Sequence, residues 1–228
     1  MLTLAIETST RKGEIALSRD GEMLSVRSLG PVSQRHATTL FVEIDAAFRE
    51  HGLSPGELTR IGVSLGPGSF TGLRIGIVAA KTLAYSLKCE LCGIDTFLAI
   101  AHAAPVELEK LYVVGDAQRG DLFVGRYESH LDGGWKQASP IEVLSIEDFL
   151  KSLSSEDHVS GPGLQRYKSE VGQKANLVEP ALREPHALAV CQLSQSQGVP
   201  LSDPWSLVPF YLRKSTAEEK WDQEQSNV

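Results

Sequence analysis

The pattern of apolar and polar positions in the first half of the chain predicts three strands, followed by helices that alternate with strands. Short apolar runs separated by polar turns are typical of strands joined by tight connections, and Asp20-Gly21 is a strong hairpin signal. Apolar residues that recur every three or four positions predict amphipathic helices. The predicted elements are strands at residues 2–7, 14–18, 23–29, 61–65 and 90–94, and helices at 34–50, 73–87 and from Thr96.

The same pattern begins again in the second half. An acidic residue ends the first strand of each half, Glu7 and then Asp116, and a Gly-Pro-Gly follows a strand at residues 66–68 and 161–163. We interpret this recurrence as a degenerate duplication of a β-β-β-α-β-α unit, which predicts an α/β chain with two lobes. The second set of elements comprises strands at 111–115, 122–127 and within 135–143, and helices at 146–153 and from Leu164. The predicted lobes are residues 1–104 and residues 105–228, the latter with a polar tail at 218–228.

The most informative stretch joins the predicted strand at residues 61–65 to the helix at 73–87 through the loop GPGSFTG, from Gly66 to Gly72. In such an arrangement, backbone N–H groups at the helix N-terminus can bind an anion, and Arg74 could add a charged contact. The alternative is a structural turn, because most glycine loops are turns. The residue types after the last glycine exclude a Walker-type loop, and the glycine spacing excludes a dinucleotide fingerprint.

The helix after this loop carries a face with almost no side chains, formed by Gly72, Gly76 and Ala80. A glycine inside a helix costs roughly 1 kcal/mol relative to alanine, so we expect another backbone to approach this face closely. That backbone could belong to the same chain or to another protein. Other residues of the helix lie off its main apolar face without being polar, which predicts an exposed apolar strip. These residues are Ile75, Val78, Ala79 and Thr82.

Composition narrows the class of protein. The 228 residues carry a net charge of −7, which argues against a protein that binds nucleic acid through a broad basic surface. The three cysteines cannot all pair, which is typical of a reducing compartment. The N-terminus lacks the pattern of a signal peptide, and no apolar run has the roughly 20 residues that span a bilayer. We therefore expect a cytoplasmic protein without a membrane segment.

Several motifs, in order along nearly the whole chain, resemble those of the TsaB (YeaZ) family. The most specific is GPGSFTGLRIG at residues 66–76. The others are IETST at residues 6–10, SQRHATTLFVEID at 33–45, DAQRGDLF at 116–123 and PFYLR at 209–213. The resemblance implies the actin-like ATPase fold (the ASKHA or ribonuclease H-like fold), whose plan is a tandem β-β-β-α-β-α unit. The family's first strand usually ends in Asp, whereas this chain has Glu7.

The resemblance implies a non-catalytic scaffold subunit. Members of the family pair with the catalytic paralogue TsaD and with the small ATPase TsaE, and the assembly attaches a threonylcarbamoyl group to N6 of adenosine 37 in tRNA. The resemblance also implies self-dimers, and contact with tRNA only through the complex. The alternative from another class is a small-molecule kinase or ATPase of the same fold.

The residues themselves argue against independent ATP chemistry. After Glu7 the first glycine is Gly13, and Asp116 is followed by Ala117-Gln118-Arg119, so both turns lack the glycines of a phosphate-binding turn. Carboxylates at such strand ends commonly cap turns or pair with arginine. The chain is expected to hold no cofactor of its own, with ADP or ATP at most at the complex interface. The candidate nucleotide contacts are Glu7, Gly68, Ser69 and Thr71.

Metal and peptidase chemistry have little support in the sequence. The histidines never fall at the close helical spacing of a metal-binding pair, and Cys89 and Cys92 form a lone C-x-x-C without a second pair. Both cysteines, like Cys191, are expected to be small buried residues. Ser69 lies in a glycine loop, but the G-x-S-x-G spacing of a nucleophile elbow is not matched.

Recognition is therefore expected on the two helices that follow the first three strands, through which the resembled family forms its pairs. We expect a bulky replacement of Gly76 to abolish complex formation while leaving the monomer folded. The predicted interface residues are Leu40, Phe41, Ile44, Gly72, Leu73, Gly76, Ile77 and Ala80.

Overall fold

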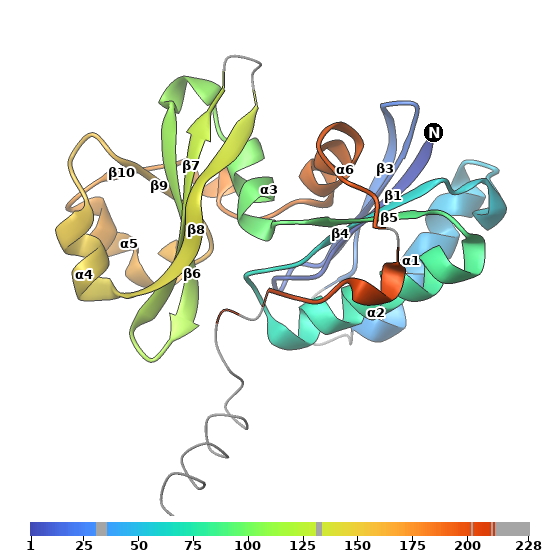
Figure 1. Cartoon of the computed structure of the whole chain (residues 1–228), viewed down its shortest axis with the longest axis horizontal. Helices are drawn as coiled ribbons and strands as arrows, with labels where there is room; N and C mark the ends of the chain where they lie inside the picture. The colour runs from blue at the N-terminus through green and yellow to red at the C-terminus, as the bar shows by residue number, and fades with distance from the viewer. Residues whose placement is uncertain (31–35, 131–133, 202, 211, 213–228) are drawn as a thin grey trace, which may run out of the picture.

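The computed structural model describes residues 1–30, 36–130, 134–201, 203–210 and 212. Within these residues the chain forms two lobes, each built on a five-stranded sheet (Figure 1). The strand orders are β3-β2-β1-β4-β5 and β8-β7-β6-β9-β10. In each sheet the first three strands in this order form antiparallel pairs. The last two strands run parallel to the central strand, which is β1 in the first sheet and β6 in the second. The identical topology confirms the predicted duplication and the actin-like fold.

The helices and strands lie close to their predicted positions. The first half contains β1 (Leu2–Glu7), β2 (Glu14–Arg19), β3 (Glu22–Ser28), α1 (His36–Glu50), β4 (Arg60–Ser64), α2 (Phe70–Leu87), β5 (Glu90–Ile94) and α3 (Thr96–His102). The second contains β6 (Lys110–Gln118), β7 (Asp121–Ser129), β8 (Trp135–Ser145), α4 (Ile146–Ser152), β9 (His158–Ser160), α5 (Leu164–Gly172), β10 (Asn176–Leu177) and α6 (Ala187–Ser196). The predicted polar tail at 218–228 lies outside the described residues.

Helix α2 begins at Phe70 rather than at Leu73, because Ser69 caps it. The Ser69 hydroxyl oxygen accepts a hydrogen bond from the Gly72 N–H at 3.3 Å. A serine at this position satisfies one of the N–H groups that have no partner in the first turn of a helix. The second half of the predicted glycine loop is therefore the first turn of the helix.

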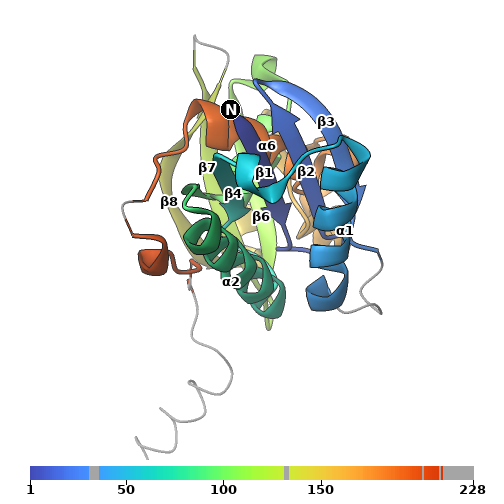
Figure 2. The same cartoon turned by 90° about the vertical axis from the view of Figure 1, so that its right-hand side faces the viewer.

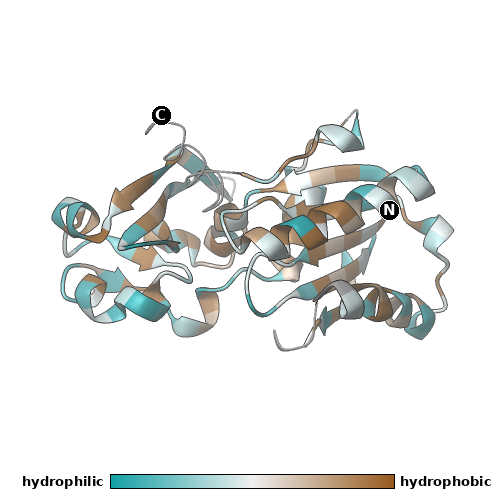
Figure 3. Ribbon diagram, turned by 90° about the horizontal axis from the view of Figure 1, so that it is seen from below, coloured by the Kyte–Doolittle hydropathy of each residue, from teal (hydrophilic) through white to brown (hydrophobic). Residues whose placement is uncertain are grey.

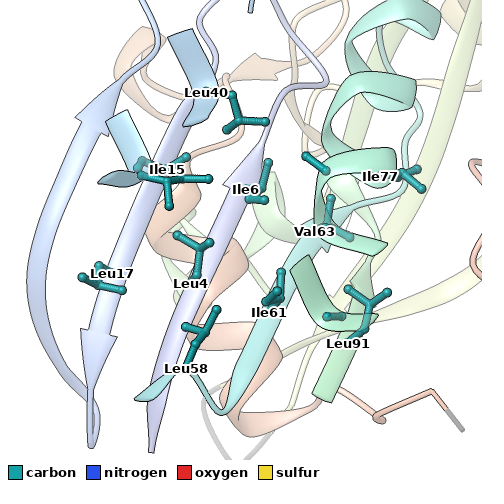
Figure 4. Packing of buried hydrophobic residues seen from close by; sticks show 14 of the residues in the cluster. Leu4, Ile6, Ile15, Leu17, Leu40, Leu58, Ile61, Val63, Ile77 and Leu91 are labelled. Atoms are coloured by element: carbon teal, nitrogen blue, oxygen red, sulfur yellow. The ribbon is translucent and has the colours of Figure 1, made fainter. Parts of the chain in front are cut away.

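One face of the first sheet carries large apolar side chains and packs against α1 and α2. Leu4 and Ile6 of β1 alternate with residues of the other face, and they meet Leu40 of α1 and Ile77 of α2 in a continuous cluster (Figure 4). All four of these side chains are almost completely buried. Figure 2 shows the two helices side by side on this face of the sheet.

The other face of the first sheet is lined by small residues and is covered by α6, which the sequence analysis did not predict. Ala5 and Ala16 pack against the helix, and a Cβ atom added to Gly62 would lie 2.8 Å from the Ser194 Cβ. Figure 1 shows α6 beside the first sheet, although it follows the strands of the second. The division between residues 104 and 105 thus separates the strands of the two sheets, but not this helix.

Helix α3 follows the strands of the first sheet in the sequence, but it packs on the second sheet. Its Phe97 fits between two glycines: Cβ atoms added to Gly115 and Gly125 would lie 2.9 and 3.0 Å from its ring. The Asp95 carboxylate caps α3 at the Phe97 N–H (2.8 Å) and accepts a hydrogen bond from the Tyr127 hydroxyl at 2.6 Å. Burial raises the pKa of Asp95 to about 6, although these two hydrogen bonds favour its charged form.

The glycine face of α2 meets the end of β1. A Cβ atom added to Gly72 would lie 2.0 Å from the Thr8 carbonyl oxygen, and one added to Gly76 would lie 2.3 Å from the Thr8 hydroxyl oxygen. The Thr8 hydroxyl donates a hydrogen bond to the Gly72 carbonyl at 2.8 Å. The backbone that the sequence analysis expected against this face therefore belongs to the chain itself. Among the described residues, no helix is both long enough and apolar enough to cross a membrane.

Replacing Gly76 by leucine is expected to destabilise the monomer, in contrast to the expectation from the sequence alone. The larger side chain would force α2 away from Thr8, and overpacking of this kind costs about 3 kcal/mol. Urea unfolding followed by circular dichroism measures the change. Val78→Leu on the exposed side of the same helix is the matched control, and it should change stability by less than about 0.5 kcal/mol. Equal midpoints for the two variants would contradict the close approach.

The N-terminus of α6 is held to the first sheet by a titratable pair. The Glu14 carboxylate accepts a hydrogen bond from the Ala187 N–H and lies within hydrogen-bond distance of His186 Nδ1, both at 3.2 Å. This contact raises the pKa of His186. For Glu14, burial raises the pKa, but the bonds from His186 and Ala187 outweigh it and lower the pKa overall.

These directions define the pH range in which His186 contributes to the free energy of unfolding. A raised histidine pKa stabilises the fold fully below the ordinary value of about 6.5, and this contribution disappears as the pH rises through the folded-state pKa. His186→Gln should therefore lower the urea midpoint more at about pH 6 than at about pH 8.5. In a Glu14→Gln background, His186→Gln should lower the urea midpoint by the same amount at both pH values. A pH-independent loss in the wild-type background would show that the pair does not titrate as described.

Candidate functional site

A cleft of about 670 Å³ lies between the two lobes and is built by loops from both halves of the chain. The β1–β2 turn contributes Arg11 and Lys12, the β4–α2 loop contributes Gly68, the end of β6 contributes Asp116, and the start of α5 contributes Arg166. In an actin-like fold these loops meet because the carboxyl ends of the parallel central strands of each sheet face the cleft. The cleft is therefore the candidate binding or catalytic site.

Glu7 lies beneath this cleft and not in it. Its side chain is completely buried and accepts hydrogen bonds from the Ser9 N–H at 2.5 Å and from the Ser64 hydroxyl. Burial raises the pKa of the carboxyl, although both hydrogen bonds act in the opposite direction. Glu7 thus organises the turn that follows β1 and cannot touch a ligand in the cleft.

Gly68 and Ser69 line the cleft and lock the β4–α2 loop onto the same turn. The Ser69 N–H donates to the Ser9 carbonyl at 2.6 Å, and a Cβ atom added to Gly68 would lie 2.6 Å from that oxygen. The Ser69 N–H and the Gly72 N–H are thus bonded within the chain. Of the candidate nucleotide contacts, the cleft brings together Gly68 and Ser69, whereas Glu7 and the exposed Thr71 do not line it.

The second half repeats this arrangement. The Asp116 carboxylate accepts a hydrogen bond from the Gln118 N–H at 2.7 Å, as Glu7 does from Ser9, and it pairs with Arg166 at 3.5 Å. The Gly163 N–H donates to the Val114 carbonyl at 2.9 Å, as the Ser69 N–H does to Ser9. Turn capping by both carboxylates and arginine pairing by Asp116, predicted from the sequence, are confirmed.

The polar groups of the cleft do not form a nucleophilic or metal site within the described part of the chain. Ser69 acts as the cap of α2, and the described residues that line the cleft include no histidine to activate it. Among the described residues, no three metal-ligating side chains come together. Cys92 and Cys191 are buried as predicted, and burial raises the pKa of the half-buried Cys89 to about 11, which disfavours a reactive thiolate.

Sequence reasoning missed most of the charged residues that line the cleft, namely Arg11, Lys12, Arg166 and Glu184. Arg11 and Lys12 had a usable signal, because they follow directly after the first strand, at the end of a sheet where sites form. Arg166 and Glu184 had none, since their position depends on how the second lobe packs against the first.

The structure buries most of the residues that were predicted to form the partner interface. All of its members except Phe41 are buried in the chain's own core: Leu40, Ile44, Gly72, Leu73, Gly76, Ile77 and Ala80. They cannot form surface contacts in this conformation, because the helices use these residues to pack on β1, β2 and β4. Phe41 is 47% exposed.

Exposed apolar residues remain on α2, where the sequence predicted a strip, but with partly different members. Val78 is 61% exposed and Thr82 is exposed, whereas Ile75 is half-buried and Ala79 is buried. Figure 3 looks at this side of the lobe and shows apolar positions along the helices. We define the helical strip as the exposed apolar and aromatic residues of α1 and α2. They are Phe41, Val42, Phe70, Val78 and Tyr85.

The C-terminal segment extends this strip. The ring of Trp205 lies 5.7 Å from that of Tyr85, and Lys81 donates a hydrogen bond to the Trp205 carbonyl at 3.0 Å. Trp205 is 57% exposed. The apolar surface therefore continues from α2 to the segment around the 3₁₀ helix Pro204–Ser206.

Comparison with known proteins places this architecture in a family. A family model described as TsaD, tRNA N6-adenosine threonylcarbamoyltransferase, matches residues 31–221. The tRNA threonylcarbamoyladenosine biosynthesis protein TsaB of Bacillus subtilis is 28% identical and covers 99% of this chain and 100% of the relative. The protein of the same name from Escherichia coli is 26% identical, covering 96% and 98%.

Solved structures show the same fold. An uncharacterized Pseudomonas aeruginosa protein described as similar to peptidase YEAZ superposes with a TM-score of 0.78 at 24% identity, over 93% of this chain and 99% of that one. YeaZ from the same organism gives 0.76 at 23% identity, over 92% and 99%. The chain therefore belongs to the threonylcarbamoyltransferase family and, within it, to the TsaB (YeaZ) proteins of tRNA threonylcarbamoyladenosine biosynthesis.

Proposed function

We propose that this chain is a non-catalytic subunit of the assembly that forms N6-threonylcarbamoyladenosine (t6A) in tRNA, and that it acts in the cytoplasm by binding the catalytic paralogue TsaD. The observation that carries the proposal is the helical strip. Exposed apolar side chains on two adjacent helices are unusual on a monomer surface and are typical of a protein interface. The biosynthetic process itself is named in the relatives from Bacillus subtilis and Escherichia coli.

The hydrogen bonds within the loops of the cleft support a non-catalytic role. The carboxylates that end β1 and β6 cap their own turns, and the Ser69 and Gly72 N–H groups bond to serine oxygens. Catalysis of phosphoryl transfer requires such groups to be directed at phosphate or metal instead. The helices above the first sheet, by contrast, form a rigid platform, because their inner faces are fully packed.

The same proposal includes the further partners of the assembly. Recruitment of the ATPase TsaE would follow from the joint surface that this chain and TsaD form. The helical strip could also pair two copies of this chain before TsaD binds, and ADP or ATP would bind, if at all, at the interface of the complex and not in this chain alone.

Val78→Asp is expected to abolish binding of TsaD while leaving the fold intact. The carboxylate would be buried without a partner in the interface, which should weaken binding at least about tenfold. Co-purification of the two proteins and titration calorimetry measure the effect. Leu188→Asp is the matched control, because Leu188 is also exposed but lies on α6, at the opposite face of the sheet. Binding that survives Val78→Asp, or that is lost equally in the control, would exclude the helical strip as the interface.

The small-molecule kinase remains the alternative, and ATP turnover separates the two functions. We expect the isolated chain to hydrolyse ATP with Mg²⁺ no faster than a buffer blank, because the carboxylates of both turns are bonded internally. A phosphate-release assay with and without Mg²⁺ tests this. Robust Mg²⁺-dependent turnover that is lost in a variant of the cleft-lining carboxylate, Asp116→Asn, would favour the kinase and reject the scaffold.

A further inference from the structure

The cleft between the lobes gathers positive charge in an acidic chain. The protein as a whole carries a net charge of −7, yet Arg11, Lys12 and Arg166 line one cleft of about 670 Å³. All three are exposed. A local group of cations on an acidic protein costs folding stability through mutual repulsion unless a ligand or partner compensates it.

The acidic groups of the cleft do not neutralise Arg11 and Lys12. Asp116 pairs with Arg166, and Glu184 accepts a hydrogen bond from the Gln165 amide at 2.6 Å. Within the described part of the chain, neither the Arg11 guanidinium nor the Lys12 ammonium lies within ion-pair distance of a carboxylate. These two cations are thus available at the mouth of the cleft.

The cleft also contains an unused hydroxyl and an aromatic wall. The Ser9 hydroxyl is buried in the wall of the cleft; the Glu7 carboxylate lies near it, but the two form no well-aligned hydrogen bond. A buried polar atom without a partner usually marks the place of a water molecule or ligand oxygen. Phe123 is half-buried on the opposite wall.

We propose that this cleft binds a single-stranded RNA segment, with Arg11 and Lys12 on its phosphates and Phe123 beside a base. Cations that contact the backbone and an aromatic side chain that stacks on an unpaired base are the features by which proteins recognise single-stranded RNA. A duplex would need a wide basic surface, which an acidic chain does not offer. That the ligand is RNA rests on the proposed function; the phosphate chemistry follows from the cleft alone.

The test uses the assembled complex with TsaD and compares two double variants. Arg11→Ala/Lys12→Ala removes the cations of the cleft mouth, and Lys110→Ala/Lys136→Ala removes two exposed lysines that flank the opposite end of the second sheet. In the cleft variant, KM for tRNA should rise roughly tenfold, while kcat and co-purification with TsaD stay unchanged. The slope of log(kcat/KM) against log salt should flatten by about 1.4, because two contacts to a single strand are removed. A KM equal to that of the control variant overturns the proposal.

Fluorescence anisotropy with the isolated chain separates the sources of phosphate. A labelled single-stranded RNA and, in a separate titration, AMP are the probes. Weaker RNA binding by the cleft variant than by the control variant supports the proposal. This holds even if the wild-type chain fails to co-purify with TsaD, because that failure would refute only the proposed function. Weaker AMP binding with unchanged RNA binding assigns the cleft to a free phosphorylated molecule and overturns the RNA assignment.

Discussion

The close contact between α2 and the end of β1 determines the geometry of the whole first lobe. Because Gly72 and Gly76 have no side chains, the helix can lie against Thr8, and the Thr8 hydroxyl bonds to its first turn. This contact places one side of α2 in the core and turns the opposite side, with Val78 and Tyr85, toward solvent. It also positions the β4–α2 loop as one wall of the cleft. The exposed helical strip and the cleft are therefore two results of one packing constraint.

In both lobes, hydrogen bonds within the chain hold the turns that face the cleft. In each half a carboxylate at the end of the central strand bonds to the turn that follows it, and a loop N–H bonds to a neighbouring backbone carbonyl. These bonds satisfy groups that would otherwise need a phosphate or water as partner. The recurrence of the same bonds in both lobes reflects the duplicated topology, and it leaves the cations at the mouth as the part that is not internally compensated.

Local patterns in the sequence were sufficient to predict most strands, both glycine loops and the tandem plan, because alternation and glycine spacing report directly on which face of an element is buried. Contacts between segments that are far apart in the sequence were harder to predict. Gly76 was expected at a partner surface, but a helix of small residues gives no indication of whose backbone it meets. Helix α6 was missed, and the small Ala187 and Ala189 among its apolar residues suit the alanine-lined face that it covers. Arg166 reaches the cleft only through the docking of the two lobes.

The exchange of helices between the lobes has a consequence for synthesis on the ribosome. The strands of the first sheet are complete at Ile94, but the helix that covers their alanine-lined face ends at Ser196. At about 5–20 residues per second, that face stays uncovered for several seconds to some tens of seconds while the second sheet is made. The first lobe therefore reaches its final form only after nearly all of the chain has been translated, so that a truncated product would present an open sheet to chaperones and proteases.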